Sequence, residues 1–65
     1  MAVKVNGQER QVPEGTSILG LLEMHKLTPE KVAVELNRRL IRTAQYAQAL
    51  NDGDEIEIVT FVGGG

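Results

Sequence analysis

The carboxy-terminal residues Gly63, Gly64 and Gly65 are the part of this chain best suited to chemistry. They follow residues 55–62, whose alternating polar and apolar side chains indicate a β-strand. Three extended residues reach at most about 10 Å, and a segment without Cβ atoms can enter slots that exclude other residues. Two interpretations are open: a tail that presents its terminal carboxylate to a partner, or a flexible end or linker without chemistry.

A terminal carboxylate is ionised at neutral pH, because its reference pKa lies at about 3.3 to 3.7. It is a poor electrophile until one of its oxygens becomes a leaving group. The chain contains no P-loop pattern that would hold a nucleotide, so another protein would have to activate Gly65.

The size and composition of the chain limit its possible functions. A chain of 65 residues is expected to form one domain with a stability of about 3 to 10 kcal/mol, which leaves little reserve for a strained catalytic pocket. It has no cysteine, which excludes a disulfide framework and a thiolate zinc site, and we expect no metal site. The net charge of −2, without long runs of one sign, argues against general nucleic-acid binding. No apolar stretch approaches a membrane span or a signal peptide, so we expect a cytoplasmic protein with no membrane partner.

Two further sets of side chains carry groups that could form a site. Ser17 and His25 are the only serine and histidine, but they lie about two turns apart along one expected helix, too far for a nucleophile and its base. We therefore expect no catalytic residue. The basic cluster of Arg38, Arg39 and Arg42 is too small for a phosphate-binding stripe and indicates a solvated turn.

The first half of the chain predicts a hairpin. Val3 and Val5 alternate with polar residues, and Asn6 and Gly7 both tolerate the positive φ of a type I′ turn. Residues 8–12 are mostly polar and suit an edge strand.

A helix of about three turns is predicted next. Thr16 or Ser17 can cap its first turn, and His25 and Lys26 are expected in its last turn. Its apolar stripe consists of Ile18, Leu19, Leu21 and Leu22.

The second half predicts further strands. Residues 32–37 alternate, residues 40–41 form a short apolar strand, residues 43–50 form a loop with one helical turn at Tyr46, and residues 51–54 form a turn before the last strand. One helix covers only one sheet face, so we expect a mixed sheet of four to five strands wrapped on that helix. This is the α+β arrangement of the ubiquitin-like β-grasp fold, with the domain at residues 1–62 and the glycine tail at residues 63–65.

The chain resembles the ThiS family, the sulfur carrier proteins of thiamin biosynthesis. The matching residues are Asn6, Gly7, residues 12–16, Leu21, Leu22, residues 32–37, Tyr46, residues 52–54, residues 56–59 and residues 61–65. They run through the whole chain, and it is their order and spacing before the final glycines that make the resemblance specific.

The resemblance implies a protein co-substrate rather than an enzyme. A ThiF-like adenylyltransferase, which would hold the ATP and magnesium, converts the carboxylate of Gly65 into an acyl adenylate. Sulfur from a persulfide donor such as a cysteine desulfurase then replaces the adenylate, and the C-terminal thiocarboxylate serves a ThiG-like thiazole synthase. The C-terminal diglycine, Gly64 and Gly65, carries the sulfur, and Gly63 completes the tail. The absence of cysteine is compatible with this cycle, because no internal thiol competes for the persulfide.

Other functions remain open. Sulfur carriers for molybdopterin synthesis or tRNA thiolation would use the same diglycine end. A TGS-like binding module resembles the turn at residues 52–54 but needs no terminal diglycine.

The last strand also predicts a partner surface. If Ile56 and Ile58 face the core, the period of two places Val59 and Phe61 on the opposite face with Glu55. Val59 and Phe61 would then be a docking contact beside the tail. The alternative is a twist or bulge that returns Phe61 to the core.

Overall fold

The computed structural model describes residues 1–61. The predicted tail at residues 63–65 and its boundary at residue 62 lie outside the described residues. In chain order the elements are β1 (Ala2–Val5), β2 (Gln8–Gln11), α1 (Ile18–Met24), a 3₁₀ helix (Pro29–Lys31), β3 (Val32–Leu36), β4 (Arg39–Ile41), a second 3₁₀ helix (Thr43–Gln45) and β5 (Glu55–Thr60).

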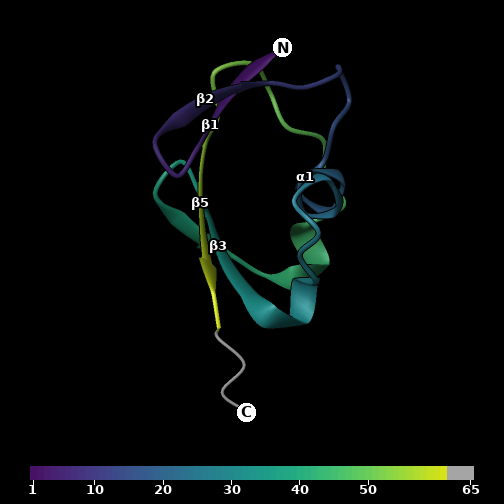
Figure 1. The fold of residues 1–65 in the computed structure, drawn as a ribbon, viewed down its shortest axis with the longest axis vertical. Coiled ribbons are helices and arrows are strands. Elements are labelled where there is room, and N and C mark those ends of the chain that lie inside the picture. Colours follow the sequence, from purple (N-terminus) through teal and green to yellow (C-terminus); the bar gives the residue numbers. More distant parts are fainter. Residues whose placement is uncertain (62–65) are drawn as a thin grey trace.

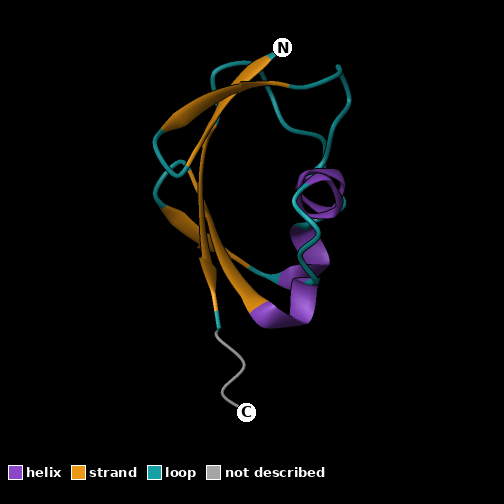
Figure 2. Ribbon diagram, in the orientation of Figure 1, coloured by secondary structure: helices purple, strands orange, loops and turns teal. Residues whose placement is uncertain are grey.

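The strands form one mixed sheet in the order β2-β1-β5-β3-β4. β1 and β5 are parallel, whereas the other neighbouring pairs are antiparallel. The sheet curves around one side of the molecule, and α1 and the 3₁₀ segments lie on the other side (Figures 1 and 2). The predicted ubiquitin-like β-grasp is confirmed, with β5 as the central strand.

A tight turn connects the two strands of each hairpin in this sheet. Asn6 and Gly7 have φ values of 50° and 83°, as the predicted type I′ turn requires, and they connect β1 to β2. Asn37 and Arg38 occupy the same left-handed region, at 52° and 71°, between β3 and β4. Every residue of β2 is exposed and the strand lies at the sheet edge, so the edge prediction is confirmed.

The helix is shorter than its sequence pattern predicts. The Ser17 hydroxyl caps it by accepting a hydrogen bond from the Gly20 N–H (3.1 Å), but its seven residues make only about two turns rather than three. Lys26 adopts a φ of 59°, and the N–H of Leu27 donates to the Leu22 carbonyl (2.9 Å), which together form a Schellman-type end.

Two further predictions about this helix were wrong. His25 and Lys26 lie after the helix rather than in its last turn, because the left-handed residue ends the α-helical bonding. Leu19 does not extend the buried stripe, since it is 36% exposed. A helix of two turns lying on a curved sheet covers only a narrow stripe, which Ile18, Leu21 and Leu22 provide.

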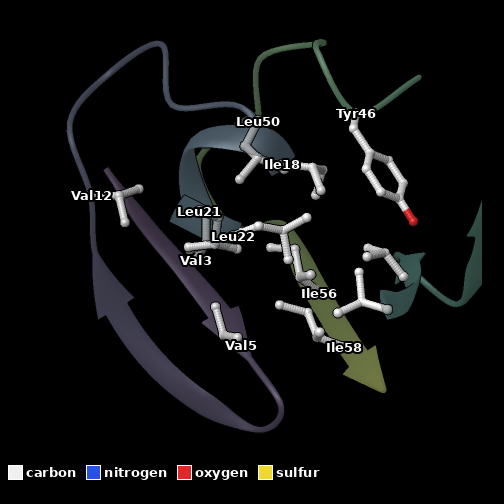
Figure 3. Packing of buried hydrophobic residues seen from close by; sticks show 12 residues of the cluster. Val3, Val5, Val12, Ile18, Leu21, Leu22, Tyr46, Leu50, Ile56 and Ile58 are labelled. Atoms are coloured by element: carbon white, nitrogen blue, oxygen red, sulfur yellow. The ribbon is translucent and has the colours of Figure 1, made fainter. Parts of the chain in front are cut away.

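The core lies between α1 and the inner face of the sheet. Figure 3 shows Ile56 and Ile58 of β5 together with Leu21, Leu22 and Val3 in one cluster. The segment after β4, predicted as a loop with one helical turn, contains the second 3₁₀ helix and also contributes to this cluster. It buries Tyr46 and Leu50, and main-chain hydrogen bonds from Leu19 to Tyr46 and from Leu50 to Thr16 attach it to the start of α1.

Candidate functional site at the end of β5

The last strand, β5, is the central strand of the sheet, and the chain leaves the sheet at its end. β5 pairs with β3 over five residues, and the Phe61 N–H donates to the Lys31 carbonyl (2.8 Å) just beyond the strand. The end of β5 leaves the sheet on the side away from the amino terminus (Figure 1). Gly63, Gly64 and Gly65, the predicted tail and sulfur-carrying end, lie outside the described residues. The structure shows where the described chain ends, at Phe61 directly after β5.

The side chains of β5 alternate as a strand requires. Ile56 and Ile58 are buried, whereas Val59 is 59% exposed and Phe61 57% exposed. The strand keeps its pairing with β3 up to Thr60, so no bulge turns Phe61 inward. Of the two predicted alternatives, the structure has the one in which Phe61 stays outside the core.

The strand register extends this apolar area across the sheet. Ala33 of β3 pairs with Val59, and Leu40 of β4 pairs with Glu35 on the same outer face. Leu40 is 73% exposed. We call Ala33, Leu40, Val59 and Phe61 the outer patch. The membership of Ala33 and Leu40 was not predicted from the sequence, where the only signal is the apolar Leu40 in a strand too short to show a period.

Carboxylates accompany the outer patch. Glu35 and Glu57 are direct cross-strand partners, and Glu55 lies two residues before Glu57 on the same face. Like charges placed opposite each other across a sheet are destabilising. Within residues 1–61 the only ion pair joins the amino terminus to Glu14 (3.8 Å), so none of these three carboxylates is in an ion pair there, although Lys4 of β1 is the cross-strand neighbour of Glu55. A basic partner surface would complement them.

The structure does not bring the other candidate residues together. Ser17 is occupied as the cap of α1, and His25 follows the opposite end of the helix. Arg38, Arg39 and Arg42 are exposed in and around the β3–β4 hairpin, as a solvated cluster should be.

The described part of the chain contains neither a metal-binding group nor a membrane-spanning helix. Among residues 1–61, no three His, Asp or Glu side chains gather as a metal-binding group. None of the helices in that part is long and apolar enough to cross a membrane.

The fold is similar to solved structures. A crystal structure of the thiamine biosynthesis protein (ThiS) from Geobacter metallireducens superposes with a TM-score of 0.80 at 36% identity, and the match covers 100% of both chains. A solution structure of a thiamine biosynthesis protein from the same organism gives a TM-score of 0.79 at 33% identity, covering 100% of this chain and 88% of that one.

Sequence relatives extend the comparison. The chain is 42% identical to a thiazole synthase of Paramagnetospirillum magneticum and 41% identical to one of Magnetococcus marinus. The matches cover all of this chain but only 20% of each thiazole synthase, so the chain spans about a fifth of their length. The uncharacterized protein ycf40 of Pyropia yezoensis is 36% identical, with 93% of its length covered. The ThiS family itself matches residues 3–65, and the chain belongs to the ThiS family.

Proposed function

We propose that this protein is a sulfur carrier of thiamin biosynthesis whose reactive group is the carboxylate of Gly65. The observation that carries this proposal is the family match, which continues through Gly63, Gly64 and Gly65 rather than stopping at the folded domain. The fold supports it, because β5 is the central strand and remains hydrogen-bonded up to Phe61. The last described residue, Phe61, is thus held in place by its hydrogen bond to Lys31.

The proposed chemistry needs a partner at every step. On a ThiF-like adenylyltransferase, a carboxylate oxygen of Gly65 attacks the α-phosphate of ATP and pyrophosphate leaves. The terminal sulfur of a persulfide, supplied by a donor such as a cysteine desulfurase, then attacks the carbonyl carbon and AMP leaves. A second thiol cleaves the resulting acyl disulfide and releases the thiocarboxylate. We place ATP and its magnesium on the adenylyltransferase.

A ThiG-like thiazole synthase is the proposed recipient of the sulfur. Support comes from the two relatives named thiazole synthase, each of which contains a segment that matches this whole chain. Such a carrier would act in the cytoplasm as a co-substrate, not as an enzyme.

Intact-mass analysis tests the proposal directly. The chain is incubated with ATP, a persulfide donor and one adenylating enzyme at a time, taken from thiamin, molybdopterin or tRNA-thiolation systems. We expect one oxygen to be replaced by sulfur with the ThiF-like enzyme. Conversion only by one of the other two enzymes would assign the protein to that pathway, and no conversion by any of them would favour a binding module.

The chain alone should neither hydrolyse ATP nor bind it tightly. The described residues bring no nucleophile and base together, and the sequence has no phosphate-binding loop. Release of phosphate from ATP by the purified protein is the measurement. Hydrolysis that a single substitution in this chain abolishes would contradict the carrier proposal.

We further propose that the outer patch docks on the adenylating enzyme. Phe61→Arg should weaken adenylation mainly through a higher KM for the chain, while the melting temperature stays nearly unchanged because the side chain is exposed. Met24→Arg is a matched control, since Met24 is 52% exposed on the helix, away from the sheet's outer face. Equal KM values for the two variants would show that Phe61 does not contact the adenylating enzyme.

A further inference from the structure

β5 is held by asparagine side chains from the two hairpins that flank it. Asn6 and Asn37 are each the first of the two central residues of a tight turn, with φ values of 50° and 52°. The turn explains the choice of asparagine, which tolerates this backbone region. The two side chains have a second role that the turn does not require: both of them form hydrogen bonds with main-chain groups of β5.

The Asn6 side chain extends the hydrogen bonding between β1 and β5 by one position beyond the end of their main-chain pairing. The register between β1 and β5 ends with Val5 opposite Ile56, and the Asn6 N–H donates to the Ile56 carbonyl (2.8 Å). In a parallel pair, the Asn6 main-chain carbonyl would next accept from the Ile58 N–H. Asn6, however, begins the turn to β2. Instead, Asn6 Oδ1 accepts from the Ile58 N–H (2.7 Å), and Nδ2 donates to the Ile58 carbonyl (3.2 Å).

Asn37 makes a comparable contact at the other end of the same strand. Its Oδ1 accepts from the Glu55 N–H (2.9 Å), and its Nδ2 donates to the Asp54 carboxylate (3.1 Å). Asn37 therefore holds the start of β5, whereas Asn6 holds the part that leads out of the sheet.

We infer that Asn6 is a positioning residue for the group transfer at the carboxy terminus, an inference that rests on the proposed function. Beyond Ile56 the β1 register has ended, and Asn6 supplies the next contact to β5 on that side. On the opposite side, β3 and the Lys31 carbonyl hold Thr60 and Phe61. Asn6 and β3 together set the direction in which β5 leaves the sheet as far as Phe61, and we expect the adenylating site to receive the chain from that direction.

The test compares Asn6→Gly with Asn37→Gly. Glycine accepts a positive φ, so each variant keeps its turn and loses one side-chain clamp on β5. Amide hydrogen exchange is measured at Ile58 and Glu55, and adenylation kinetics are measured with the chain as the varied substrate. Asn6→Asp is a second variant that keeps the acceptor for the Ile58 N–H but cannot donate to the Ile58 carbonyl when ionised.

Asn6→Gly is expected to accelerate exchange at Ile58 on the order of tenfold, as the loss of a hydrogen bond implies. It should lower kcat by roughly tenfold or more, because a displacement of about 1 Å in a reacting atom can cost about a hundredfold. KM for the chain should change little, because the outer patch keeps its β3 pairing. Asn37→Gly should accelerate exchange at Glu55 and leave kcat close to that of the unmodified chain, and Asn6→Asp should fall between the two.

Equal kcat values for Asn6→Gly, Asn37→Gly and the unmodified chain would overturn the inference. If Asn6→Gly does not fold, Asn6→Asp decides: it loses the hydrogen bond to the Ile58 carbonyl, and a kcat equal to that of the unmodified chain would reject the positioning role. An unmodified chain that no adenylating enzyme accepts would instead reject the proposed function. The exchange comparison at Ile58 would still report whether Asn6 holds the strand.

Discussion

Deleting Gly65, or appending one residue after it, should abolish adenylation and leave the melting temperature almost unchanged. Either change displaces the terminal carboxylate by a residue length, about 3.5 Å, which is several times the misplacement that costs an enzyme about a hundredfold. Among the described residues the buried core runs from Val3 to Ile58 and does not reach the altered end. Intact-mass detection of the adenylate and a thermal melt are the two measurements.

Gly64→Ala should act in the same direction, because a methyl group is added where the adenylating site must admit the chain. Gly20→Ala is the control for adding a methyl group elsewhere. Gly20 lies in α1, and a Cβ there would meet Thr16 Cγ2 at 3.6 Å and Ser17 Oγ at 3.7 Å, which are ordinary contacts. That variant should fold and be adenylated normally. Normal thiocarboxylation of the chain extended by one residue, without prior trimming, would show that Gly65 is not the reacting group.

Leu22→Ala should lower the free energy of unfolding by about 2 to 5 kcal/mol, the usual cost of truncating a buried leucine. Leu22 is 0% exposed, at the centre of the contact between α1 and the sheet. A chain of this length is expected to have only about 3 to 10 kcal/mol in total, so the variant could lose most of its stability. Urea denaturation followed by circular dichroism gives the difference.

Leu19→Ala is the matched control for this substitution, since Leu19 belongs to the same helix and is 36% exposed. Its loss of unfolding free energy should be clearly smaller, because truncating a partly exposed leucine removes less buried apolar surface. Equal losses for the two variants would show that the buried face of α1 is assigned incorrectly.

Much of the fold could be predicted from local patterns in the sequence. A period of two in β5 correctly separated buried Ile56 and Ile58 from exposed Val59 and Phe61, because successive side chains of a strand must point to opposite faces. The turn at Asn6 and Gly7 was predictable because few residue pairs tolerate positive φ. In these cases the signal lies within a few neighbouring residues.

The length of α1 shows where local patterns fail. A lysine rarely adopts the left-handed conformation that ends a helix, so Lys26 gave no warning of the stop that its φ of 59° imposes. The Schellman-type bond from Leu27 to Leu22 and the packing of Leu27 on the core accompany that conformation. Tertiary context therefore outweighed the local preference.

The candidate site divides in the same way between sequence and structure. The chemical end of the site, Gly64 and Gly65, is predicted from the sequence alone, through its residue types and their order, and it stays a prediction because it lies outside the described residues. Only the tertiary structure decided that Leu40 joins Val59 on one face and that Asn6 holds Ile58, 52 residues away. Pairing between strands depends on how the whole chain closes into a sheet, and no short stretch of sequence records which distant main-chain groups will face its side chains.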